Sequence, residues 1–142
     1  MTLFILEHDR RTILRRWLRT NLIWTGACGL FSAVYENFSH GVFSNWMIFL
    51  FLFPLLGGVL PTLALLGLGE RLWLPDRAVR NLWNCGVATL TVGSSVAGVL
   101  EIYGTTSDYL PVYGIVGGIL VIAGALTYGL RRAVLLKKSP EP

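Results

Sequence analysis

Four long apolar segments run through this chain of 142 residues. They cover residues 18–38, 46–68, 82–102 and 110–130, and each exceeds the roughly 18 apolar residues that indicate a membrane-spanning helix. Hydrophobic residues make up 54% of the chain and the mean hydropathy is +0.60, which is too apolar for an ordinary soluble domain. We therefore predict an all-α polytopic membrane protein, a four-transmembrane-helix bundle that forms one membrane domain over residues 1–142.

The basic residues follow a topological pattern. All 12 Lys and Arg residues lie before or at the start of the first segment, between the second and third, or after the fourth. They are Arg10, Arg11, Arg15, Arg16, Arg19, Arg71, Arg77, Arg80, Arg131, Arg132, Lys137 and Lys138. Because Lys and Arg near span ends are retained in the cytoplasm, both termini are expected there, with residues 1–17 as a basic N-terminal segment and 131–142 as a tail. Localisation to the plasma membrane, as in the bacterial cytoplasmic membrane, follows.

The net charge of +4 is accordingly a topology signal rather than a sign of nucleic-acid binding. The expected partner is the lipid bilayer, whose anionic headgroups the basic rim would attract. Residues 2–17 mix apolar residues with acids and arginines, which suits either a short helix lying in the headgroup region before the first span turns inward or a basic flanking tail.

The second apolar segment contains helix-breaking residues. Pro54 and Pro61 flank the glycine pair 57–58, and this combination removes backbone hydrogen bonds and permits a kink. Broken helices are tolerated in membranes where neighbours or water satisfy the freed carbonyls. Ser44 or Asn45 is placed to cap the start of this helix.

Small side chains recur at helical spacing on three of the predicted spans. Such stripes let another helix approach closely, so we predict close packing within the bundle, with one stripe available for a second copy or a larger membrane protein. The residues are Thr25, Gly29, Ala33, Cys85, Thr89, Gly93, Ala97, Gly114 and Gly118.

A shift of 65 residues aligns the two halves of the chain at a few positions. Glu36 then falls on Glu101, and Phe38 on Tyr103. Each half would then form a helical hairpin, and the two hairpins would have the same orientation in the membrane. The pattern therefore predicts an internal repeat of two hairpins.

Three stretches also carry a resemblance: "SAVYENFSHGVFSNWM", "FPLLGGVLP" and "TLTVGSSVAGVLEIYGTTSDYL". Together they resemble the corresponding parts of small uncharacterised four-helix bacterial membrane proteins, over roughly residues 18–130. The resemblance implies no activity, and adds an expectation that the turns away from the termini matter.

The acidic residues at the non-cytoplasmic end form the main candidate site. At about 1.5 Å per residue, Glu36 lies roughly 26 Å along a helix from Arg19, and Glu101 roughly 32 Å from Arg80. Both carboxyls thus fall near the outer boundary of a hydrocarbon core about 30 Å thick, where the sequence provides no Lys or Arg. The ligand-binding candidates are Glu36, Asn37, His40, Glu101, Tyr103 and Asp108.

Three interpretations of these residues remain open. Glu36 and His40 would share a helical face at i and i+4 and, with another outer acid, coordinate a metal ion, although one outer histidine is few for a metal site. Glu36 and Glu101 would instead exchange protons or bind cations, as acids within membranes often do. In the third interpretation they are ordinary boundary residues with side chains that reach water.

The preferred function is a transport module for a cation or a cationic small molecule, acting as a homo-oligomer or with a larger membrane protein. The alternative is a structural or accessory subunit with no ligand of its own. An enzyme is the weakest hypothesis, because no nucleotide, nucleophile or metalloprotease motif is present. No cofactor is expected: His8 and His40 would lie on opposite sides of the membrane, so one chain does not offer both to a haem iron.

Overall fold

The computed structural model describes residues 2–138, with the side chains of residues 9–69 and 71–137. Every regular element of this part is helical, which confirms the all-α class. The helices are α1 (Thr2–Phe38), α2 (Asn45–Ile48), α3 (Leu52–Pro54), the π-helix η1 (Leu55–Val59), α4 (Leu60–Gly67), the 3-10 helix η2 (Gly69–Arg71), α5 (Arg77–Ile102) and α6 (Leu110–Lys138).

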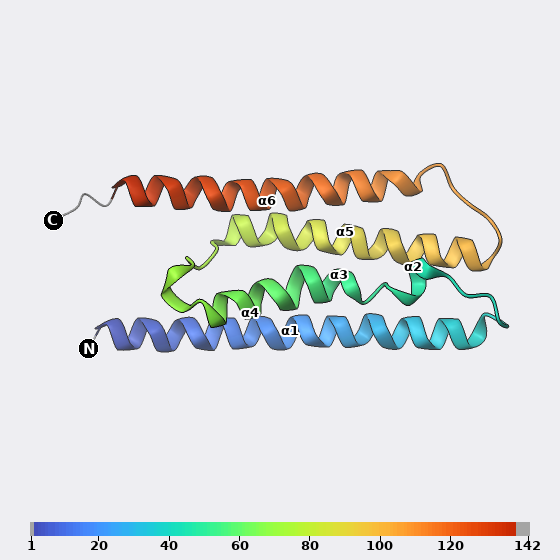
Figure 1. Cartoon of the computed structure of the whole chain (residues 1–142), viewed down its shortest axis with the longest axis horizontal. Coiled ribbons are helices and arrows are strands. Elements are labelled where there is room, and N and C mark those ends of the chain that lie inside the picture. Colours follow the sequence, from blue (N-terminus) through green and yellow to red (C-terminus); the bar gives the residue numbers. More distant parts are fainter. Residues whose placement is uncertain (1, 139–142) are drawn as a thin grey trace.

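The helices run back and forth as an antiparallel row (Figure 1). α1 lies along one side, the broken segment from α2 to α4 comes next, and α5 and α6 follow in chain order. The broken segment packs against both α1 and α5, and α5 packs along α6. The start of α1, the α4–α5 connection and the end of α6 therefore lie at one end of the bundle (Figure 1).

The first helix is longer than predicted. α1 continues without interruption for 37 residues, so the interpretation of residues 2–17 as a separate helix in the headgroup region is wrong. The physical reason lies in the sequence, since no Pro or Gly precedes Gly26 and the arginines here are good helix formers.

The second predicted span is a broken helix, as its prolines and glycines indicated. Ser44 caps α2 by accepting a hydrogen bond from the Met47 N–H at 3.4 Å, which confirms the predicted cap. Downstream, Pro54 precedes the π-helical turn η1 and Pro61 lies in the first turn of α4. A proline has no N–H to donate to the carbonyl four residues earlier, so Pro61 leaves the Gly57 carbonyl without its helical partner.

The connection between α4 and α5 is held at the basic end of the bundle. Arg10 on α1 donates to the Leu72 carbonyl at 2.7 Å, and the Tyr128 hydroxyl on α6 donates to the Trp73 carbonyl at 2.8 Å. Asp76 caps α5 through the Val79 N–H. These bonds tie the first and last helices to the same loop.

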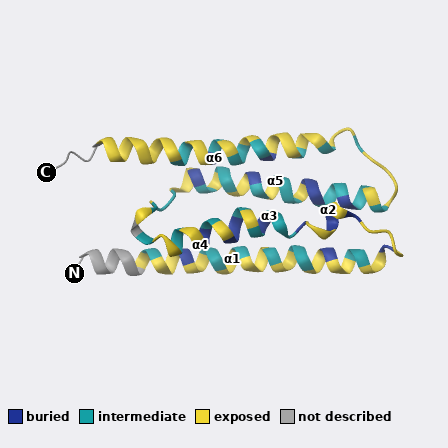
Figure 2. Ribbon diagram, viewed as in Figure 1, coloured by how far each residue is buried: buried dark blue, intermediate teal, exposed yellow. Residues whose placement is uncertain are grey.

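Three helices in the described part are long and apolar enough to cross a membrane, over residues 45–67, 77–102 and 110–137. The predicted span 18–38 is not among them. Buried residues gather along the broken segment and the inner sides of its neighbours, while much of the apolar surface is exposed (Figure 2). Only 11% of the most apolar window of α6 is buried. Such exposure is expected of helices whose surroundings are lipid rather than water.

Candidate functional site

The structure brings Glu36 and Glu101 to the same residue, Ser44. Glu36 lies in the last turn of α1, and its Oε1 accepts a hydrogen bond from the Ser44 backbone N–H at 3.1 Å. Glu101 lies in the last turn of α5, and its Oε2 accepts from the Ser44 hydroxyl at 2.5 Å. Ser44 itself is fully buried. We call these three residues the carboxylate pair site.

The carboxylate pair site has an excess of acceptors. The single hydroxyl proton of Ser44 is directed to Glu101, and Oε2 of Glu36 is buried without a hydrogen-bond partner. The sequence has no Lys or Arg between residues 19 and 71 or between 80 and 131, so no cationic side chain from this end of the bundle neutralises the pair. Two carboxylates on a shared donor repel each other, and a bound cation would offset this repulsion.

Glu36 is half-buried and Glu101 is exposed. The other predicted ligand residues are exposed as well, and none of them is hydrogen-bonded to Ser44 in the described part of the chain: Asn37, His40, Tyr103 and Asp108. α1 ends at Phe38 and His40 adopts a left-handed conformation with φ of 56°. Glu36 and His40 therefore do not share a helical face, and that form of the metal hypothesis is wrong. Within the described residues, no group of three or more His, Cys, Asp and Glu side chains is arranged to hold a metal ion.

The small residues predicted to pack occupy varied positions. A Cβ atom at Gly93 would approach Tyr113 Cβ on α6 to 2.5 Å, whereas one at Gly114 or Gly118 would meet no described atom within 4 Å. Gly29 faces Phe51 at 3.9 Å, and Ala97 is half-buried. Two more are exposed, Ala33 and Cys85. The hydroxyls of the remaining two bond to carbonyls of their own helices: Thr25 and Thr89.

Sequence reasoning missed a close backbone approach between α5 and α6. A Cβ atom at Gly86 would lie 2.9 Å from the Gly117 carbonyl oxygen, and one at Gly117 would lie 3.1 Å from the Gly86 oxygen. Gly86 and Gly93 recur seven residues apart on α5, as do Gly117 and Gly124 on α6. This heptad spacing of glycines could have predicted the α5–α6 contact.

Sequence reasoning also missed the side chains that bind the carbonyls of the broken segment. Trp83 on α5 donates its indole N–H to the Gly57 carbonyl at 2.6 Å, replacing the bond that Pro61 does not make. Asn21 on α1 donates to the Gly58 carbonyl at 3.0 Å. These hydrogen bonds could have been predicted from polar side chains that lie within apolar segments, because a Pro–Gly segment leaves carbonyls that need donors from neighbouring helices.

The carbonyls of α2, at the other end of the broken segment, accept hydrogen bonds from side chains in the same way. Ser32 donates to the Met47 carbonyl at 2.7 Å and Ser94 donates to the Trp46 carbonyl at 2.7 Å. Both serines are buried. These buried polar side chains therefore have a structural role, because they stabilise an irregular backbone away from water.

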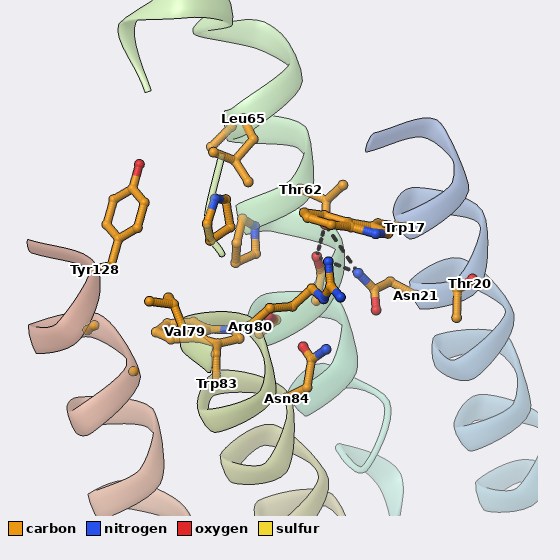
Figure 3. A pocket seen from close by; sticks show the side chains of 17 residues that line it. Trp17, Thr20, Asn21, Thr62, Leu65, Val79, Arg80, Trp83, Asn84 and Tyr128 are labelled. Atoms are coloured by element: carbon orange, nitrogen blue, oxygen red, sulfur yellow. Dashed lines mark hydrogen bonds between the residues drawn. The ribbon is translucent and has the colours of Figure 1, made fainter. Parts of the chain in front are cut away.

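A cavity of about 460 Å³ opens at the basic end of the bundle, between α1, α4, α5 and α6 (Figure 3). Arg80 reaches across it, and its guanidinium carbon lies 4.5 Å from the centre of the Trp17 ring, within the range of a cation–π interaction. Asn21, Trp83 and Asn84 also line it (Figure 3). Its volume is typical of small-molecule sites.

Comparison with known proteins assigns no family. No family model matches the chain, and no curated protein or solved structure shows significant similarity to it. The candidate sites are therefore interpreted from their own geometry.

Proposed function

We propose that this protein is a small integral membrane module that binds and exchanges a proton or a small cation at the carboxylate pair site. The observation that carries the proposal is the convergence of Glu36 and Glu101 on Ser44, with one carboxylate oxygen buried and unpartnered. A bound cation would pair with both carboxylates, which no Lys or Arg from this end of the bundle neutralises.

The topology of this proposal has four spans with both termini in the cytoplasm of a plasma membrane. The 37 residues of α1 give a helix about 56 Å long, which is more than a bilayer core of about 30 Å requires. The most polar side chains after Arg19 in α1, those of Asn21, Glu36 and Asn37, lower its hydropathy. Two of them make hydrogen bonds to the neighbouring broken segment or the loop before it, so their polarity is compatible with a spanning position.

The broken segment adds a second line of support. Discontinuous helices in membrane transporters often adjoin the ion-binding site. Ser44 is both the N-terminal cap of α2 and the shared partner of the two carboxylates. The cap of the irregular helix and the proposed site are thus the same residue.

The test is charge removal at the pair with a matched acid as control. Glu36→Gln and Glu101→Gln keep the shape of the side chains, while Asp108→Asn removes an exposed outer acid that is not bonded to Ser44. Each purified variant is reconstituted in liposomes that contain a pH-sensitive dye, and proton flux is measured under gradients of sodium, potassium, magnesium or tetraethylammonium ions. Thermal unfolding in the same salts reports binding, because a ligand that binds the folded state raises Tm.

The proposal expects flux and salt-dependent stabilisation to fall at least tenfold in both Gln variants and to persist in Asp108→Asn. It is overturned if the double variant Glu36→Gln/Glu101→Gln equals the parent in every salt, or if the parent shows no flux and no salt-dependent stabilisation.

A structural or accessory subunit is the second candidate, and the exposure of α6 favours it. Ile115 and Leu126 are each 61% exposed, so this face is available to a second copy or a larger membrane protein. In this case the buried polar side chains only stabilise the backbone of the broken segment and bind no ligand. A double Gln variant that equals the parent in every salt and still associates like the parent would support this candidate.

A further inference from the structure

A second cavity continues from the one at the basic end. It has a volume of about 540 Å³ and lies between the broken segment and α5, with Val121 of α6 on its wall. The two cavities share Gly57 and Trp83 as lining residues. They are therefore adjacent, and the hydrogen bond from Trp83 to the Gly57 carbonyl lies between them. We call the two cavities together the groove.

The two parts of the groove differ in chemistry. The basic part contains the guanidinium of Arg80 and the amides of Asn21 and Asn84. The other part is lined mainly by apolar and aromatic residues of the broken segment, such as Phe49, Phe53 and Leu56, and by Val87 and Leu90 of α5. The groove is thus polar and cationic at one end and apolar along the rest.

Among the side chains that the structure describes, no carboxylate is paired with the positive charge in the groove. No acidic residue lines either cavity in the described part of the chain. The nearest carboxylate in sequence, Asp76, forms an ion pair with Arg131 instead. Arg80 contacts the Trp17 ring, which leaves its N–H groups directed to the cavity available to an anion.

We propose that this groove binds one acidic phospholipid, with its phosphate on Arg80 and an acyl chain in the apolar cavity. From Arg80 to Ser94, the lining of the groove extends along α5 for roughly 21 Å, a length suited to a chain rather than to a compact anion. An arginine at the basic end of a membrane helix is also where anionic headgroups are found. The Arg80 end of the groove lies at the opposite end of the bundle from the carboxylate pair, whereas the apolar cavity extends to Asn45, the residue after Ser44.

The experiment measures thermal unfolding of the full chain in dodecyl maltoside with added lipids or anions. The probes are dioleoyl phosphatidylglycerol, dioleoyl phosphatidylcholine, dioctanoyl phosphatidylglycerol, glycerol 3-phosphate and inorganic phosphate. Native mass spectrometry of the same samples counts retained lipids. Dioleoyl phosphatidylglycerol should raise Tm by several degrees and be retained as one molecule, while the zwitterionic lipid of the same chains, the short-chain lipid and the soluble phosphates should act weakly.

The matched variants are Arg80→Gln and Arg77→Gln. Arg77 lies on the same helix end and does not line the groove. The Tm difference between the two dioleoyl lipids should disappear in Arg80→Gln, persist in Arg77→Gln and be partly kept in Arg80→Lys. Because each variant is compared with itself, a general loss of stability cancels.

Three results would overturn the proposal. Equal effects of the two dioleoyl lipids on the parent would mean that the headgroup charge is not recognised. Equal effects of phosphatidylglycerol and inorganic phosphate would mean that a soluble anion suffices. Equal losses in Arg77→Gln and Arg80→Gln would indicate diffuse attraction to the basic end. If Arg80→Gln does not fold, the parent and Arg80→Lys decide the first two points.

Discussion

The contact between α5 and α6 allows a quantitative prediction for Gly86→Ala. The new methyl carbon would lie 2.8 Å from the Val121 backbone nitrogen and 2.9 Å from the Gly117 carbonyl oxygen. Ordinary contacts of a carbon atom are about 3.5 Å or longer, so the helices must separate by roughly 0.6 Å. Both obstacles are backbone atoms and do not rotate away. Overpacking of this kind costs about 1–3 kcal/mol, and the helical preference of Ala over Gly offsets up to about 1 kcal/mol.

We expect a net loss of up to about 2 kcal/mol, measured as a lower free energy of unfolding in mixed micelles titrated with a denaturing detergent. Gly118→Ala is the matched control, since a Cβ atom there meets no described atom within 4 Å, and it should be neutral or stabilising. Gly117→Ala should be destabilising, and its effect should not add to that of Gly86→Ala because the two share one contact. The reasoning is refuted if Gly86→Ala is as stable as Gly118→Ala.

Three further predictions concern topology and packing. A cysteine at Thr105, in a chain without its native cysteines, should be labelled by an impermeant maleimide from the side opposite the termini; labelling from the cytoplasmic side alone would contradict the proposed topology. Trp83→Phe should lower the free energy of unfolding by about 1–3 kcal/mol because the Gly57 carbonyl loses its donor, and exposed Trp73→Phe should change little; equal effects would argue against that bond. Gly93→Leu should reduce the yield of folded protein in size-exclusion chromatography because Tyr113 leaves no room; parent-like elution would contradict the contact.

The helical class and the irregular second span were predictable because they depend on local sequence. Long apolar runs predict helices, and the two prolines predict a break wherever they occur in a helix. The length of α1 was not predictable from the same signals. Its basic first half looks like an interfacial segment, but helix continuity depends on the absence of breakers rather than on hydropathy.

The sequence predicts that small residues at helical spacing pack against another helix, but it does not predict which of two neighbouring rows of small residues does so. A stripe based on Cys85 and one based on Gly86 differ by about 100° around the helix, and both contain small residues. The partner decides between them: Gly117 presents its carbonyl to Gly86, while Cys85 is exposed. A single sequence carries little information about which small residue a neighbouring helix will approach.

The carboxylate pair illustrates the same limit at the candidate site. The sequence marked Glu36 and Glu101 as outer acids with no cation nearby, but Ser44 was identified only as a cap. Its backbone N–H and its hydroxyl point to different helices, a relation that depends on how the turn after α1 places α2 between α1 and α5. Because the same hydroxyl oxygen accepts from the Met47 N–H, a change in the charge or protonation of Glu101 acts directly on the first turn of α2. A hydrogen bond to a carboxylate is roughly twice as strong as one to a neutral group, so the site and the broken helix are physically linked through one serine.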